Sequence, residues 1–399
     1  MITRFRVQNY KALRDVTLDL TPMHLLIGPN DSGKTSILEA MAALCRSVEE
    51  PLADAFVGTW HGASLVYNQD VKLAVTLAAT IEDSEAIETI HYQLEVSFHP
   101  DPESRSVKEF SETLDYNEEG YVLAEHDGSN TTRLRLVSVK GMPVPDVVPK
   151  PLATDVIDAL RGVQLYRFVP DHLALPAALD SRRRMRMEPS GFGLPTLLDD
   201  IRDFDPRRFD ELQARFKSIF PDIAAMRPRT EIGYSARSYN NGQVLKFEQA
   251  EGKGLHFAFV GDAPDVAASQ VSDGMLLVLA YLAILYLPKP PRVLLIEEPE
   301  NGIHPARLQE VLTILRDLVK EQSQTQVVLT SHSPYVVSMF GPEEVTLCHK
   351  GDDGSIQVRR LSDSKAVREQ VDFFTLGEIW TLEGDEALLE TGLEEPSTP

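Results

Sequence analysis

Hydrophobic and polar residues alternate near the start of the chain, which is the pattern of half-buried strands. The alternation runs over residues 16–20, and the apolar run Leu25-Leu26-Ile27 follows a turn at Pro22. A helix is predicted to begin at Gly33-Lys34-Thr35, because apolar residues then recur with the spacing of one helix face. These apolar residues are Ile37, Leu38, Met41, Leu44 and Cys45.

The middle of the chain is predicted to be rich in strands. From about residue 60 to residue 150, apolar residues recur with a period of two in short runs separated by turn signals, as in a β-meander. Residues 154–162 then fit a helix, and residues 163–169 fit another strand. This segment is therefore expected to form a β-rich insertion.

Two amphipathic helices are predicted after that insertion. They cover residues 197–204 and 206–220, and Asp205 is the candidate N-cap of the second. Residues 226–260 return to strand patterning, with Asn241-Gly242 as the expected turn of a hairpin.

The last third of the chain alternates helix and strand, which is typical of a parallel α/β sheet. The pattern predicts a helix over 274–287, a strand over 292–296, a helix over 305–322 and a strand over 326–330. After Arg368 the chain has nine acidic side chains and no Lys or Arg. A disordered acidic tail is therefore expected over 376–399.

The composition is that of a folded and acidic protein. The 399 residues include 39 Lys and Arg against 61 Asp and Glu, and this net charge of −22 excludes a protein that coats nucleic acid by bulk charge. Two cysteines cannot build a disulfide framework, and the longest apolar run, 275–287, is too short to span a bilayer. We therefore expect a cytoplasmic protein that does not enter a membrane.

The strongest motif is a phosphate-binding loop. Its residues are Gly28-Pro29-Asn30-Asp31-Ser32-Gly33-Lys34-Thr35, which satisfy GxxxxGK(S/T) between an apolar strand and a helix, and Ser36 follows. Backbone N–H groups of such a loop face phosphate oxygens at the start of the helix. Lys34 would reach the β- and γ-phosphates, and the Thr35 hydroxyl would ligate Mg²⁺.

Two adjacent carboxylates, Glu297 and Glu298, follow the apolar residues 293–296. Ligands bind at the carboxyl ends of parallel strands, so Glu297 could hold Mg²⁺ and Glu298 could activate water. Without the phosphate loop, an acidic pair that merely begins a solvated loop would explain this pattern equally well.

Two further signals are weak when taken alone. His332 follows the predicted strand over 326–330, where it could bond a γ-phosphate or simply lie beside a helix cap. Ser272-Asp273-Gly274 precedes an apolar helix and by itself fits an N-cap.

Taken in order, these motifs resemble those of the ABC-type ATPases of the RecF, SMC and OLD (overcoming lysogenization defect) group. The similar stretches are FRVQNYKALRDVTLDL, GPNDSGKT, SDG, LLIEEPENGIHP and LTSHSP. The resemblance implies an α/β P-loop NTPase with a mixed or parallel sheet, helices on both of its faces, and β-rich and helical insertions. It also implies that ATP and Mg²⁺ bind between two subunits.

The same resemblance implies a role for each motif. Glu297 would be the Walker B acid, Glu298 the catalytic base and His332 the switch histidine. Residues 272–274 would be a shortened signature motif that binds the γ-phosphate of ATP held by a second subunit. The chain departs from the family pattern at Glu297, where Asp is usual, and at His304, where many members have Asp.

Spacing separates this chain from longer members of the group. Lys34 and Glu297 lie 263 residues apart without the heptads of a long coiled coil. Only 67 residues follow His332, fewer than the TOPRIM nuclease domain of OLD proteins needs, so a nuclease is expected on a partner chain. The expected segments are an ATPase lobe with Walker A (1–60), a β-rich insertion with a return strand (61–170), a helical and β lobe (171–262), a C-terminal ATPase lobe (263–375) and the acidic tail (376–399).

One cluster of positive charge opposes the acidic composition. Arg182, Arg183, Arg184 and Arg186 lie within five positions and could bind phosphates, nucleic acid or an acidic partner, although a solvated, salt-bridged loop is the simpler interpretation. By resemblance, we expect an ATP-hydrolysing switch that works as a homodimer or higher homo-oligomer in DNA-related phage defence or genome maintenance, together with an effector or nuclease partner. The alternative is a slowly hydrolysing, ATP-bound scaffold that restrains a toxic partner as an antitoxin does.

Overall fold

A computed structural model describes residues 1–56, 61–82, 89–101, 104, 106–117, 119–144, 148–179, 185–239, 242–261 and 264–390. The chain divides into two compact units that do not follow the order of the sequence. The first unit comprises Met1–Gln164, Pro291–Leu295 and Gln324–Pro399, and the second comprises Leu165–Pro290 and Ile296–Ser323.

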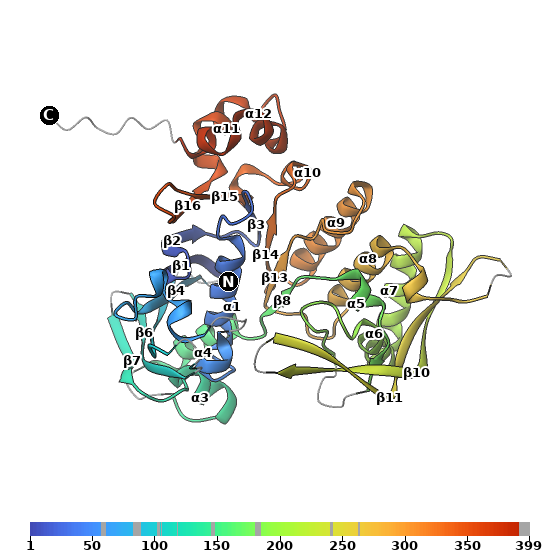
Figure 1. Cartoon of the computed structure of the whole chain (residues 1–399), viewed down its shortest axis with the longest axis horizontal. Helices are drawn as coiled ribbons and strands as arrows, with labels where there is room; N and C mark the ends of the chain where they lie inside the picture. Colours follow the sequence, from blue (N-terminus) through green and yellow to red (C-terminus); the bar gives the residue numbers. More distant parts are fainter. Residues whose placement is uncertain are drawn as a thin grey trace. The chain divides into compact units, whose positions relative to one another are not determined.

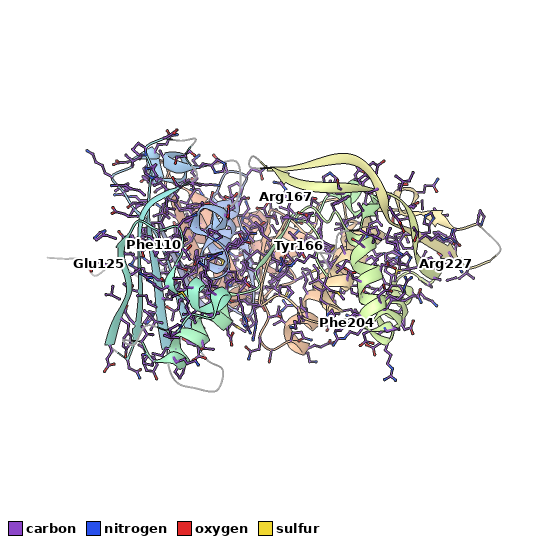
Figure 2. The ribbon with its side chains drawn as sticks, turned by 90° about the horizontal axis from the view of Figure 1, so that it is seen from below. Phe110, Glu125, Tyr166, Arg167, Phe204 and Arg227 are labelled. Carbon is purple, nitrogen blue, oxygen red and sulfur yellow. The ribbon has the colours of Figure 1, made fainter. Side chains whose placement is uncertain are left out.

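The first unit contains a sheet of six antiparallel strands, in the order β2-β1-β4-β5-β6-β7 (Figure 1). The predicted meander is confirmed over residues 75–127, where it continues the sheet that the first two strands begin, whereas residues 133–140 of the same predicted segment form a helix. Buried and more exposed residues alternate along β5, so one face is covered. The strands are β1 (Ile2–Tyr10), β2 (Leu13–Asp19), β4 (Val75–Glu82), β5 (Thr89–Phe98), β6 (Val107–Tyr116) and β7 (Glu119–Asp127). On the last two strands, Phe110 is buried and Glu125 is exposed (Figure 2).

A second six-stranded sheet carries the predicted α/β core, in the order β16-β15-β3-β14-β13-β8. It is mixed, because β3 is parallel to β14 and β15 whereas β15 and β16 are antiparallel. Strands β3, β13 and β14 are buried along their whole length, as strands covered on both faces are. The strands are β3 (Met23–Ile27), β8 (Gln164–Tyr166), β13 (Val293–Glu297), β14 (Gln326–Ser331), β15 (Val345–Lys350) and β16 (Ile356–Arg360).

Four helices belong to the first segment of the first unit, Met1–Gln164. They are α1 (Lys34–Arg46), α2 (Leu52–Ala55), α3 (Arg133–Lys140) and α4 (Lys150–Leu160). Helix α1 begins where the sequence predicts and buries the predicted apolar face. A buried carboxylate fixes α3 to the meander, because Glu112 of β6 accepts hydrogen bonds from the N–H groups of Arg133 and Leu134 and from the Tyr92 hydroxyl.

The expectation of a disordered tail over 376–399 is wrong for its first part. Three helices end the described chain: α10 (Pro334–Val337), α11 (Lys365–Gln370) and α12 (Leu376–Leu389) (Figure 1). Thr375 and Glu378 form a capping box at the start of α12, while Leu376, Ile379 and Leu388 are buried. The prediction failed because it rested on the acidic composition and gave no weight to these few buried apolar residues. Residues 391–399 lie outside the described residues.

Among its described residues, the second unit contains five α-helices and a small sheet. The helices are α5 (Pro170–Ala174), α6 (Leu194–Phe204), α7 (Pro206–Ile219), α8 (Asp273–Leu285) and α9 (Pro305–Glu321). The predicted cap of α7 is confirmed, since the Asp205 side chain accepts a hydrogen bond from Arg207 N–H. Helix α8 is buried on all sides from Met275 to its end, and it packs against the other four helices. An ion pair between Arg215 and Asp317 joins α7 to α9.

Two expectations about strands are corrected in detail. The strand predicted over 163–169 is shorter, because β8 ends at Tyr166 and Pro170 opens α5. The sheet of the second unit contains β9 (Ala177–Ala178), β10 (Ile223–Tyr239), β11 (Gly242–Phe259) and β12 (Val266–Ala267). Tyr239 pairs with Gly242, so Gly242 belongs to β11 and not to the turn. Asn241 lies outside the described residues.

Candidate functional site

The phosphate loop of the first unit closes around the Lys34 ammonium group. Lys34 is only 7% exposed, and its Nζ donates to the carbonyl oxygens of Gly28 at 2.8 Å and Pro29 at 2.7 Å and to the Ser32 hydroxyl at 3.3 Å. Gly33 precedes α1 and has no side chain to cap the first N–H groups of that helix. The loop thus combines a buried cation with a helix N-terminus, which is an arrangement suited to phosphate.

Both glycines of the motif are required by the backbone. Gly28 has a φ of 138°, and a Cβ atom at this position would lie 2.1 Å from the Cys348 carbonyl oxygen. Gly33 has a φ of 83°, and its Cβ atom would lie 2.8 Å from the Ile356 side chain. Any other residue would therefore be strained at either position, and at Gly28 it would also collide with β15.

Strand register brings His332 beside this loop. Ser331, the last residue of β14, pairs with Ile27, the last residue of the parallel strand β3. The next residues of the two strands are the exposed His332 and Gly28, which opens the phosphate loop. Two motifs that lie about 300 residues apart in the sequence therefore meet at one edge of the sheet, within the first unit.

The two carboxylates of the predicted Walker B motif belong to the second unit, at the end of β13. Glu297 is 8% exposed, and its Oε2 lies 3.6 Å from Nη1 of Arg167. Glu298 is half-buried and accepts a hydrogen bond of 2.6 Å from the Asn301 side-chain amide. Its φ of 46° is in the left-handed region, which is unfavourable for a residue with a side chain. Such strain is concentrated at functional sites.

The predicted signature residues begin α8 in the second unit. Ser272 occupies the N-cap position, but its side chain does not cap the helix, and both Ser272 and Asp273 are exposed. They line a cavity of about 1010 Å³ together with Gly274, Met275, Phe220, Gly302, His304, Ala306 and Arg307. His304 caps α9, since its Nδ1 accepts a hydrogen bond from Ala306 N–H.

The Arg307 guanidinium in this cavity is held in place by two contacts. It lies 4.6 Å from the centre of the Phe220 ring and donates to the Ile219 carbonyl oxygen at 3.1 Å. Arg307 could not be predicted from the sequence, because a single cation in the first turn of a helix carries no motif.

The oxygen donors present fit the ligands that the motifs predict. Hydroxyl and carboxylate oxygens, such as those of Thr35 and Glu297, are the ligands that Mg²⁺ prefers. The Arg167 guanidinium already places a positive charge beside the Glu297 carboxylate, and the loop around Lys34 is suited to phosphate. Thr35 and Glu297 belong to different units, so their joint coordination of one ion remains a prediction.

The predicted basic cluster is described only in part. Arg186 is exposed, whereas Arg182, Arg183 and Arg184 lie outside the described residues. Within the described ranges, no helix combines the length and hydrophobicity that a membrane crossing requires.

Two family models match separate parts of the chain. Residues 1–136 match the "AAA ATPase domain", and residues 155–338 match the family described as "AAA domain, putative AbiEii toxin, Type IV TA system". The OLD nuclease of Thermus scotoductus is 44% identical over 41 residues, which are 10% of this chain and 8% of that protein. The chain thus matches only a small part of the length of this curated relative.

Two solved structures share the fold. An SMC head bound to the C-winged helix domain of ScpA superposes with a TM-score of 0.53 at 14% identity, and the match covers 90% of this chain and 97% of that one. An SMC head with an extended coiled coil, from Pyrococcus furiosus, has a TM-score of 0.50 at 12% identity and covers 93% and 99%. The fold is that of an ABC-type P-loop ATPase, and the family matches support an ABC-type ATPase of the RecF, SMC and OLD group.

Proposed function

We propose that this chain binds and hydrolyses ATP with Mg²⁺ and works as a nucleotide-driven dimer switch. The observation that carries the proposal is the pairing of β3 with β14, which supports a shared role in phosphate binding for Lys34 and His332. Glu297 would hold Mg²⁺, and Glu298 would accept a proton from the attacking water.

Dimerisation would complete each nucleotide site. In this proposal, residues 272–274 of one subunit bind the γ-phosphate of ATP held by the loop 28–35 of its partner. The exposure of Ser272 and Asp273 and the cavity beside them support this role. ATP would then hold two subunits together and hydrolysis would release them, so nucleotide state controls subunit geometry.

The biological role that we propose is DNA-related defence against phage or genome maintenance, with an effector or nuclease partner. The short similarity to OLD nuclease supports this role. The test is ATP turnover by the purified chain, with and without double-stranded DNA. Turnover that DNA stimulates is the expected result, and turnover that DNA leaves unchanged would contradict a direct role of DNA.

The second candidate function is an ATP-bound scaffold that restrains a toxic partner. It is favoured by the family match over residues 155–338, whose description refers to a Type IV toxin–antitoxin system. Purified protein that retains ATP and barely hydrolyses it, in the presence and absence of DNA, would support this candidate over the first.

A further inference from the structure

Arg167, which is labelled in Figure 2, is a cation that the sequence motifs do not include. It faces the predicted metal-binding carboxylate. Its Nη1 lies 3.6 Å from Oε2 of Glu297. The contact follows from the sheet, because β8 is the neighbour of β13. Arg167 comes directly after β8, and Glu297 is the last residue of β13.

The backbone around Arg167 is fixed, although its side chain reaches solvent. Arg167 N–H donates to the Pro189 carbonyl oxygen at 2.8 Å. The residues on either side, Tyr166 and Phe168, are buried with their ring centres 4.9 Å apart, and the Phe168 ring also contacts Tyr281. The position of the Arg167 backbone is therefore fixed by the fold, and from this position the guanidinium faces Glu297.

The two partners of the ion pair differ strongly in their exposure. The Arg167 side chain is 66% exposed, whereas that of Glu297 is 8% exposed. A nearly buried carboxylate needs a positive charge beside it, and either a guanidinium or a metal ion can supply that charge. Two cations close to one carboxylate repel each other, so a metal ion at Glu297 favours movement of the guanidinium. Arg167 can move without unpacking the core, whereas Glu297 cannot.

We propose that Arg167 is the internal counter-ion of Glu297 and competes with Mg²⁺ for this carboxylate. The inference rests on the proposed function, because it takes Glu297 as the metal ligand. In the absence of nucleotide, the ion pair lowers the affinity of Glu297 for a divalent cation. When Mg²⁺ arrives with ATP, the guanidinium is released toward solvent and the nucleotide phosphates, which are an alternative partner for it. Arg167 thus makes metal capture depend on bound nucleotide.

The test is a titration of the full chain with Mn²⁺, a paramagnetic substitute for Mg²⁺. Free Mn²⁺ is measured by electron paramagnetic resonance, with and without the non-hydrolysable analogue AMP-PNP. For Arg167→Gln we expect half-saturation without nucleotide at about three- to tenfold lower Mn²⁺ than for the wild type, because a competing charge is lost. Arg167→Lys should restore most of the wild-type behaviour.

Arg161→Gln is the matched control. Arg161 is a half-exposed arginine whose ion pair with Asp158 lies within one helical segment, and it belongs to the first unit, whereas Glu297 belongs to the second. Its replacement should leave the Mn²⁺ titration unchanged. In a Glu297→Gln background, Arg167→Gln should also have no further effect, because the carboxylate for which the two cations compete is then absent.

The outcomes separate the inference from the proposed function. If the wild type binds Mn²⁺ with AMP-PNP but Arg167→Gln binds it equally or more weakly without nucleotide, the inference is wrong. A change of equal size in the Glu297→Gln background would overturn it as well. If the wild type binds neither AMP-PNP nor Mn²⁺, it is the proposed function that fails.

Discussion

Removal of the Lys34 ammonium group should abolish tight nucleotide binding. Its Nζ is held at the centre of the loop by two carbonyl oxygens and one hydroxyl, and phosphate oxygens would replace part of this set. A hydrogen bond to a charged group contributes about 1.5–3 kcal/mol, so two lost phosphate contacts amount to about 3–6 kcal/mol. The Kd of ATP for Lys34→Ala should therefore rise by about 10²- to 10⁴-fold.

Isothermal titration calorimetry with ATP and Mg²⁺ measures this change directly. Lys350→Ala is the matched control, because Lys350 is a more exposed lysine that pairs with Asp31 of the same loop at 2.5 Å. The control should shift the Kd by less than about threefold, as expected for a surface ion pair. Thermal unfolding of both variants shows whether the fold is intact. If folded Lys34→Ala binds ATP within about threefold of the wild type, the Lys34 ammonium group does not bind the phosphates.

Four further expectations can be checked independently. Glu298→Gln should accumulate as an ATP-bound dimer, which gel filtration would detect. Hydrolysis at the wild-type rate would show that Glu298 is not the base. Arg307→Ala should weaken ATP-dependent dimerisation of the Glu298→Gln variant while leaving ATP binding to the monomer intact, and an unchanged dimer would exclude a role for this cavity. Burial raises the pKa of Glu112 to about 7 from 4.5, so the folded chain holds the proton more tightly; the free energy of unfolding should fall by on the order of 3 kcal/mol from pH 4.5 to 7 and then level off. Glu112→Gln should remove this slope in urea titrations, and a slope that persists would assign it to other groups. Replacing the four arginines of 182–186 by Ser should weaken DNA binding and reduce its dependence on salt, whereas unchanged binding would leave the cluster as a solvated loop.

The parts of the site that the sequence predicted are those that depend on local chemistry. The loop around Lys34 and the start of α1 follow from a glycine pattern between a strand and a helix, and the Asp205 cap follows from one side chain at a helix start. Each of these features needs only a few consecutive residues, so tertiary structure does not change them.

Features that depend on strand order could not be read from the sequence. The Arg167–Glu297 ion pair joins residues 130 positions apart, and it exists only because β8 and β13 are neighbours in the sheet. The Phe220–Arg307 contact likewise requires α7 to end beside the start of α9. The residue pattern of one strand cannot specify which strand lies beside it, which is why the motifs located Glu297 but not Arg167, the cation that faces it.

The C-terminal helices determine how the acidic residues near the end of the chain affect contact with DNA. Since α12 is folded onto α10 and α11, the acidic residues of α12 belong to an ordered surface and not to a chain that could move away from a ligand. Contact between α12 and α10 is close, because a Cβ atom on Gly377 would lie 1.9 Å from the Pro334 carbonyl oxygen. An acidic surface that is fixed in this way repels the phosphate backbone at short range whatever the nucleotide state. Any DNA contact of this chain must therefore use a different surface or be made by a partner protein.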